Sequence, residues 1–462
     1  MARFVRGSMF ALAALIAACS STGDAGGSPL LGDPSAEPDP ASPDERPSED
    51  TLPDAGADDP SEPVDPDASA APARFVDTCD LQASACTAAP AGFTEGSGLA
   101  PVDRCAFGLV ESAGLGTTTP ALVTALEKIT TKVGVVDVLA DANRTATKTT
   151  SVPGSPSGVA YAFRWQNDDN ASTQWVPQGI TGTADADPTG KVGGKSAVLV
   201  SFYDTAENGT SNEGVRIAFV DTTTPNAPKY RFALLVMPKG SAAAPTFDPV
   251  KIHAGGIAWY GSFLYVADTT RGLRVFDLRH ILRVATDAGA FGCTGTTCRA
   301  AGYKYVLPQV GKYDITSACK PLFSFVSLDR KSDPPALVSG EYCSTTACSG
   351  PLAGRVYRWP LDPSTGLLRS KTTFPTEVFL TSHKQVQGAA SVGDTYYLSS
   401  SAPAASGGAL YRVSEKKSAT SRWSDSPEDL MVDHAAGWLW SLSEAADARA
   451  VYAAALTSYP KP

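Results

Sequence analysis

The feature that most limits the fold of this chain is a recurring unit of short apolar runs after residue 133. Each run holds a few residues of Val, Ile, Leu, Tyr, Phe or Trp, and Gly, Pro, Asp, Ser and Thr turns separate the runs. Such runs predict β-strands connected by tight turns. Five units repeat this order, and they begin near Gly179, Ile257, Phe323, Gly388 and Leu430.

An array of three- or four-stranded units that bury their faces against their neighbours is typical of a β-propeller. We therefore predict an all-β fold over residues 133–462, a propeller of five to seven blades. Six are favoured because the segment before Gly179 adds to the five units. The last unit shows only three strands, so we expect Val159–Trp165 to complete that blade and close the ring. A pair of β-sandwiches or an irregular β-solenoid explains the recurrence less well.

Residues 76–132 have a different composition and predict a small cap tied by disulfide bonds. Three cysteines stand there among small residues. One amphipathic helix is expected at the end of this segment, with Thr119 as the N-cap, Pro120 at the first helical position and a last turn near Lys132.

Two of the five units carry a family resemblance. The run Gly256–Asp277 resembles the LVIVD-type propeller repeat of bacterial and archaeal cell-surface proteins, and Val215–Pro228 is similar to the strand and Pro-containing turn of that repeat. The other three units have Ser-rich or Trp-rich strands and lack this turn. The resemblance implies a location at the cell surface and names no activity.

The N-terminus predicts export. Arg3 and Arg6 precede an apolar run, Met9–Ala18, which is too short to span a bilayer but suits a signal peptide over residues 1–18. The sequence Leu15–Cys19 resembles the bacterial lipobox. This resemblance implies that the thiol of Cys19 is lipidated and that acyl chains hold the protein on a membrane. Ordinary cleavage nearby, which would give a soluble secreted protein, is the alternative.

Residues 19–75 read as a lipid anchor and a disordered acidic tether. The stretch is rich in Pro, Asp, Glu, Ser and Ala and has almost no large apolar residue. Residues 20–74 hold 14 acidic residues and two arginines, whereas the whole chain has a net charge of −10, so the rest of the chain is close to neutral. The predicted propeller thus lacks the basic surface that nucleic-acid binding requires. Ser20 after the lipidated cysteine is compatible, by resemblance to lipoprotein sorting signals, with the outer membrane.

The nine cysteines leave an even number once Cys19 is assigned to lipid. Two pairs share the spacing C-x-x-x-x-C inside loop-like stretches, so we expect the disulfides Cys293–Cys298 and Cys343–Cys348. The connectivity of the other four cysteines stays open. Zinc binding is the rival use, but neither C-x-x-C pairs nor histidines at ligand spacing accompany them.

A search for catalytic motifs is negative, and we lean against an enzyme. Histidines at metal-binding spacing, a G-x-S-x-G elbow and a phosphate loop are all absent from the sequence. Sites in propellers gather single residues from several blades around the central channel, so we expect functional residues at the starts of the inner strands. Alignment of the units there gives four candidate ligand-binding residues, Gln178, His253, Gln387 and Glu428.

His253, Glu428 and Asp429 are also the candidate catalytic residues, with His253 as a base tuned by a nearby carboxylate. The simpler interpretation is that these polar groups serve turns. No cofactor is required, but Asp185 and Asp187 stand before Gly190 as in the opening of a calcium loop.

The sequence thus favours an envelope lipoprotein whose propeller binds a polysaccharide or an envelope protein, with a membrane contact through its lipid. A hydrolase or lactonase-like enzyme with a channel-mouth site is the second hypothesis, and a purely structural envelope component is the third. Propellers host binding and catalysis alike, so the fold by itself does not choose among these.

Overall fold

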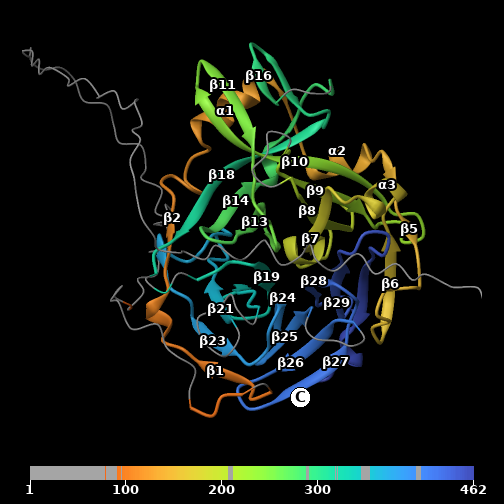
Figure 1. Ribbon diagram of the computed structural model, residues 1–462. Helices are drawn as coiled ribbons and strands as arrows, with labels where there is room; N and C mark the ends of the chain where they lie inside the picture. The colour runs from red at the N-terminus through yellow and green to blue at the C-terminus, as the bar shows by residue number, and fades with distance from the viewer. Residues whose placement is uncertain are drawn as a thin grey trace, which may run out of the picture. The chain divides into compact units, whose positions relative to one another are not determined.

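The structure is a computed structural model that describes residues 79, 91–94, 96–206, 212–287, 291–317, 319, 321–344, 354–401 and 407–462 (Figure 1). All of them belong to one compact unit, Arg74–Pro462. The predicted signal peptide, the lipidated Cys19 and the acidic tether lie outside the described residues. Within the described part, no helix is long and apolar enough to cross a membrane.

Each of the five predicted units forms a group of four antiparallel strands, and these groups are the blades of a propeller, of which blades 1 and 2 share one larger sheet. From the channel outward, blade 1 consists of β7 (Trp175–Gly182), β8 (Ala197–Asp204), β9 (Val215–Asp221) and β10 (Lys229–Ser241). In the same order, blade 2 consists of β12 (Ile257–Tyr260), β13 (Phe263–Asp268), β14 (Gly272–Asp277) and β18 (Tyr305–Ile315). Blade 3 consists of β19 (Phe325–Asp329), β20 (Ala336–Gly340), β21 (Arg355–Pro360) and β23 (Glu377–Thr381). Blade 4 consists of β24 (Val386–Val392), β25 (Thr395–Ser400), β26 (Ala409–Val413) and β27 (Ser418–Arg422). Blade 5 consists of β28 (Pro427–Asp433), β29 (Trp438–Ser443), β30 (Val451–Ala455) and β6 (Val159–Arg164).

The inner strands close a ring around the channel. They contact one another in the order β7, β12, β19, β24, β28 and back to β7. Strand β6 pairs antiparallel with β30, with Val451 opposite Phe163, which confirms that Val159–Trp165 completes the last blade. The count is five, at the lower end of the predicted range and one fewer than favoured, because the segment before Gly179 supplies an outer strand and not a blade.

Apolar side chains hold the blades together in pairs. Among the described residues, five buried clusters occur, one between each two successive blades. Because each sheet is covered on both faces, strands such as β13 are buried along their whole length and read as continuous apolar runs in the sequence. The recurrence in the sequence is therefore the signature of these shared cores.

The N-terminal part of the described chain runs along the outer edges of the blades. β1 (Leu99–Pro101) pairs with β23, and β2 (Leu109–Glu111) pairs with β18 and with β22 (Thr372–Thr373). β4 (Arg144–Thr145) pairs with β10, and β5 (Thr147–Lys148) pairs with β6. The segment thus covers backbone groups that edge strands would leave open.

The predicted helix is present as α1 (Ala121–Ile129), and Val123, Ala125 and Leu126 are buried on its inner side. Its N-cap is Pro120, not Thr119, and no side chain makes a capping hydrogen bond there. Three shorter helices occur where the sequence predicted none: α2 (Val135–Ala140), α3 (Asn167–Ala171) and α4 (Thr183–Ala186).

Outer strands of blades 1 and 2 continue into an extension at the top of Figure 1. β10 and β18 pair in parallel there, with Leu234 opposite Val306. The other strands of the extension are β11 (Ala244–Pro249), β15 (Ile281–Arg283), which pairs with β3 (Thr131–Val133), β16 (Phe291–Thr294) and β17 (Thr297–Ala300). Short 3-10 helices are η1 (Arg104–Ala106), η2 (Leu278–His280) and η3 (Leu456–Ser458).

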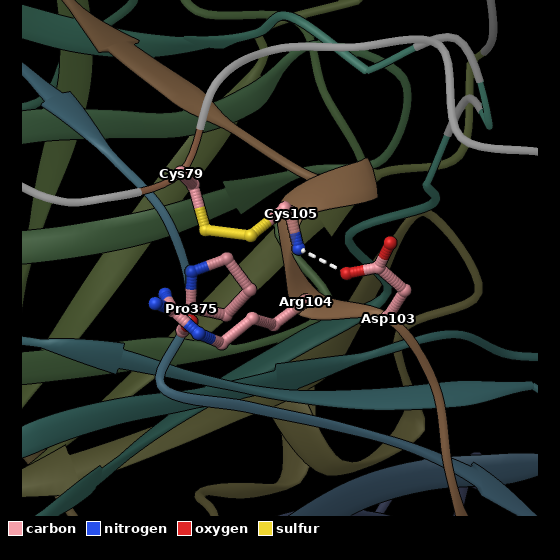
Figure 2. The surroundings of a disulfide bond; sticks show 5 residues. All are labelled: Cys79, Asp103, Arg104, Cys105 and Pro375. Atoms are coloured by element: carbon pink, nitrogen blue, oxygen red, sulfur yellow. Dashed lines mark hydrogen bonds between the residues drawn. A yellow bond between two sulfur atoms is a disulfide. The ribbon is translucent and has the colours of Figure 1, made fainter.

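Disulfide bonds staple loops at the edges of the fold. The predicted Cys293–Cys298 bond is confirmed, and it joins β16 to β17. A second bond links Cys79 to Cys105 in η1, where the backbone N–H of Cys105 also donates to Asp103 (Figure 2). Cys319 and Cys343 are disulfide-bonded as well. Cys348, the predicted partner of Cys343, lies outside the described residues.

Candidate functional site

The inner strands begin at the same end of the channel, which we call the channel entrance. Close backbone approaches between blades fix this alignment. A Cβ atom on Gly179 would lie 2.7 Å from the backbone nitrogen of Ile257, and one on Gly388 would lie 2.5 Å from the Cα of Asp429. Only glycine allows backbones to pack this closely. Gly179 in β7 is thereby held against the start of β12, and Gly388 in β24 is held against Asp429 in β28.

Four predicted candidates, Gln178, Gln387, Glu428 and Asp429, come together at this end with Glu444, and we call these five residues the entrance cluster. The amide of Gln178 donates to the Glu444 carboxyl over 2.8 Å, and the amide of Gln387 donates to Glu428 over 3.2 Å. Gln178, Glu428 and Asp429 are buried, Glu444 is 9% exposed and Gln387 is partly exposed. Gln387 is therefore the most solvent-exposed member of the cluster.

The carboxyl groups of the cluster have raised pKa values. Burial raises the pKa of Glu428 well above its ordinary value, and the charges of Glu444 and Asp429 raise it further. Burial also raises the pKa of Glu444 to about 7, although the hydrogen bond from Gln178 and the charge of Arg449 oppose this shift. Carboxyls that lack a close cation avoid ionisation in a buried site. The environment of the cluster therefore favours the protonated form of Glu428, and Glu444 is about half protonated at pH 7.

Asp429 has a second role, which is to join three blades. Its Oδ2 accepts the backbone N–H groups of Ile180 in β7 and Ile257 in β12, over 3.2 Å and 3.3 Å. Burial raises the pKa of Asp429 well above its ordinary value, and these backbone N–H groups partly oppose the shift. Because Asp429 satisfies inner-edge N–H groups of two other blades, we assign it to the framework of the entrance.

His253 lies apart from these hydrogen bonds. Its ring packs against Tyr203 at 4.3 Å between centroids, just before β12, and is partly exposed. Burial lowers the pKa of His253 to about 4, so its imidazole is neutral at neutral pH. The sequence suggested a base tuned by a carboxylate, but within the described ranges no carboxylate bonds to His253. The structure offers an aromatic pair at this position.

Sequence reasoning missed Glu444 and Arg449, which belong to the loop between β29 and β30. Arg449 is buried and donates from Nε to the Glu444 backbone carbonyl over 2.8 Å and from Nη1 to the Asp169 carbonyl over 2.6 Å. The search covered only the starts of inner strands. A glutamate directly after the apolar run of β29 was the available signal.

The two candidate calcium ligands are engaged in local hydrogen bonds. Asp185 accepts from the Thr181 hydroxyl over 2.7 Å, and burial raises the pKa of its carboxyl to about 8. Asp187 accepts from the backbone N–H and the hydroxyl of Thr189, over 2.8 Å and 2.5 Å. Across the residues that the structure describes, no three His, Cys, Asp or Glu side chains are grouped so as to hold a metal ion.

Comparison with known proteins gives little beyond these findings. No family model matches the chain, and no curated protein matches it. Among solved structures, it is similar to a GH43_1 enzyme from Xanthomonas citri at 9% identity, over 72% of this chain and 92% of that one, with a TM-score of 0.28. The same enzyme complexed with xylotriose gives the same identity and coverage and a TM-score of 0.24. The five-blade assignment comes from the sheets and cores of this chain itself.

Proposed function

We propose that this chain is a lipid-anchored protein of the cell envelope whose propeller binds a hydroxyl-rich ligand, such as a polysaccharide, at the channel entrance. The observation that carries the proposal is the pairing of two amides with two buried carboxyls of raised pKa, Gln178 with Glu444 and Gln387 with Glu428. Envelope location rests on the lipobox resemblance at Leu15–Cys19.

The chemistry of the entrance cluster favours a neutral polar ligand over an ion. Protonated carboxyls and amides each carry both donors and acceptors, and sugar hydroxyls have the same dual capacity. An anion would gain no cation in the cluster, and a cation would have to deprotonate carboxyls whose burial opposes charge. The aromatic pair of Tyr203 and His253 adds a ring surface of the kind on which sugars pack.

A second candidate function, glycoside hydrolysis or related acid catalysis, has one specific observation in its favour. Glu444 has a pKa of about 7, and its charge raises the pKa of a second nearby carboxyl, that of Glu428. Hydrolysis of glycosides uses a protonated carboxyl as general acid together with a second carboxylate. Against this function, burial and neighbouring charges raise the pKa of Glu428 well above its ordinary value, which opposes the ionised form that such a partner needs.

One experiment separates binding from catalysis. The chain, made without its signal peptide and with Cys19→Ser in an oxidising compartment, is screened on a glycan array, and the best ligand is titrated by calorimetry. We expect Gln387→Ala to weaken binding by about tenfold, since an amide hydrogen bond is worth about 1 kcal/mol and more when its partner is left buried. Glu444→Gln keeps an uncharged hydrogen-bonding group and should bind within a few-fold of the unaltered chain.

The matched control is Gln309→Ala, which removes an amide bonded to Arg274 over 2.9 Å on the outer strand of blade 2. Equal affinities for Gln387→Ala and Gln309→Ala would contradict the entrance as the binding site. Turnover of any glycan that disappears in Glu444→Gln would establish the hydrolase in its place. Capture of an envelope protein without any glycan would move the ligand to the protein class.

The anchor is tested separately. Membrane lipoproteins partition into the detergent phase of a Triton X-114 extract, so the full-length chain should appear there and the Cys19→Ser variant in the aqueous phase. The same phase for both variants would contradict lipidation at Cys19.

A further inference from the structure

A pocket of about 270 Å³ lies on blade 1 between β4, β9, β10 and the loop before β18, and it shares no lining residue with the entrance cluster. Four cationic side chains line it: Arg144 from β4, Arg216 from β9, Arg231 from β10 and Lys304 from the loop. They come from sequence positions that are 160 residues apart at the extremes, so no local motif announces them.

The carboxylates that pair with these cations stand outside the lining of the pocket. Asp169 accepts from Arg216 and Arg144, each over 2.9 Å. Asp141 lies 2.9 Å from the Lys304 ammonium and 3.7 Å from the Arg231 guanidinium. Two carboxylates therefore pair with four cations, and of these six side chains only the cations line the pocket.

Glu213 is the acidic side chain within the lining. Burial raises the pKa of Glu213, and the charge of Asp204 raises it further, whereas Arg216 lowers it. The lining itself carries four cations and one acidic side chain. Asp204, whose carboxylate accepts the Glu213 backbone N–H over 2.9 Å, joins Asp141 and Asp169 behind the lining, so the four cations face four carboxylates with Glu213 ionised and three with Glu213 protonated. A surplus of positive charge therefore appears when Glu213 is protonated.

Arg216 makes the floor of the pocket rigid. Its side chain is 5% exposed, and its guanidinium lies over the rings of Phe232 at 3.8 Å and Trp175 at 4.3 Å. Nη1 donates to the Tyr303 hydroxyl over 3.3 Å, and Nε has no hydrogen-bond partner among the described residues. Because Nε is itself buried, the more exposed side chains of Arg144, Arg231 and Lys304 are the cations that a ligand in the pocket can reach.

We propose that this pocket is a binding site for a small oxyanion, a phosphate or sulfate group. Guanidinium groups present planar N–H forks that match such oxygens, and the ammonium of Lys304 adds a point charge. The volume fits a single oxyanion with a small substituent and is below that of sites for larger organic ligands. The site is separate from the entrance cluster, so one can fail without the other.

The test is titration of the mature chain with sodium phosphate, against sodium chloride at matched ionic strength, followed by calorimetry and thermal melts. Phosphate should raise the melting temperature by mass action, and chloride should not. Lys304→Gln and Arg231→Gln should each weaken phosphate binding by about tenfold or more. These variants spare Arg216, whose loss would threaten folding. Lys312→Gln is the control, because it breaks a comparable ion pair with Asp314 at 2.7 Å on β18.

The same titration with glycerol phosphate, and with glycerol as the neutral control, distinguishes the source of the group. Tighter binding of the monoester than of inorganic phosphate assigns the site to a phosphate carried on a larger molecule, and the reverse assigns it to the free anion. Equal effects of phosphate and chloride would overturn the proposal and leave the four cations as structural ion pairs. Unchanged affinity in both Lys304→Gln and Arg231→Gln would overturn it as well.

Discussion

Blade 3 and the entrance cluster both bury carboxyl groups, but they surround them differently. In blade 3, Glu341 accepts from Arg355 over 2.7 Å and 2.8 Å, and Asp329 accepts from Arg358 over 2.7 Å. In the entrance cluster, the amides of Gln178 and Gln387 take the place of the arginines.

The consequence is a difference in charge. Burial opposes the charge of Arg358, yet Tyr396 and the hydrogen bond and charge of Asp329 raise the pKa of this guanidinium above its ordinary value, so the ion pair persists. Burial raises the pKa of Glu428 and Glu444, and among the described residues no guanidinium forms an ion pair with either carboxyl, although the charge of Arg449 partly opposes the shift of Glu444. Blade 3 therefore uses its buried carboxylates for framework contacts, whereas the entrance holds uncharged groups that can exchange their hydrogen bonds with a ligand.

The largest expected effect is in blade 3. Asp329→Ala removes the more buried of the two carboxylates that pair with Arg358, and it also removes the acceptor of the Ser391 hydroxyl, which lies 2.6 Å away. Breaking one side of a buried pair costs about 3 to 5 kcal/mol, and denaturant unfolding measures it. The matched variant at the entrance is Glu428→Gln, which replaces a protonated carboxyl by an amide of similar shape, and we expect its free energy of unfolding to change by less than about 1 kcal/mol. Equal destabilisation by the two variants would erase the distinction between the two regions.

A smaller effect should appear in the pH dependence of stability. The pKa of Glu444 rises from 4.5 to about 7 on folding, so between these values the folded state binds more protons than the unfolded state. Stability should therefore be highest below about pH 4.5 for this group, fall as the pH rises to about 7, and level off above. The loss is on the order of 3 kcal/mol at most, because 1.36 kcal/mol corresponds to one pKa unit. Glu444→Gln should flatten this slope, whereas Gln309→Ala should leave it intact.

The sequence was informative wherever the fold depends on local pattern. The five units, the closing strand β6 and the Cys293–Cys298 bond all follow from runs and spacings of neighbouring residues. The number of blades was overestimated because the segment before Gly179 was counted in addition to the five units, whereas it supplies only the outer strand β6 of the last blade. The Cys79–Cys105 bond has no comparable local signature.

The site was predictable only in part. Alignment of inner strands found Gln178, Gln387, Glu428 and Asp429, because their place depends on the repeat. Glu444 reaches the same cluster from the loop after β29, and its distance from Gln178 depends on how blades 1 and 5 pack. The pKa shifts depend on burial, which a single sequence does not give. The pocket lined by Arg144, Arg216, Arg231 and Lys304 was not predictable either, because tertiary packing brings these residues together.

The most direct test of the central claim is the affinity for the best glycan from the array, measured by calorimetry from pH 5 to pH 9. If protonated carboxyls at the entrance bind the ligand, affinity should be constant at low pH and fall as the pH rises through about 7, the pKa of Glu444, while the Glu444→Gln variant stays constant. Affinity that rises with pH, or that falls equally in both chains, would contradict an entrance cluster that acts through its uncharged carboxyl groups.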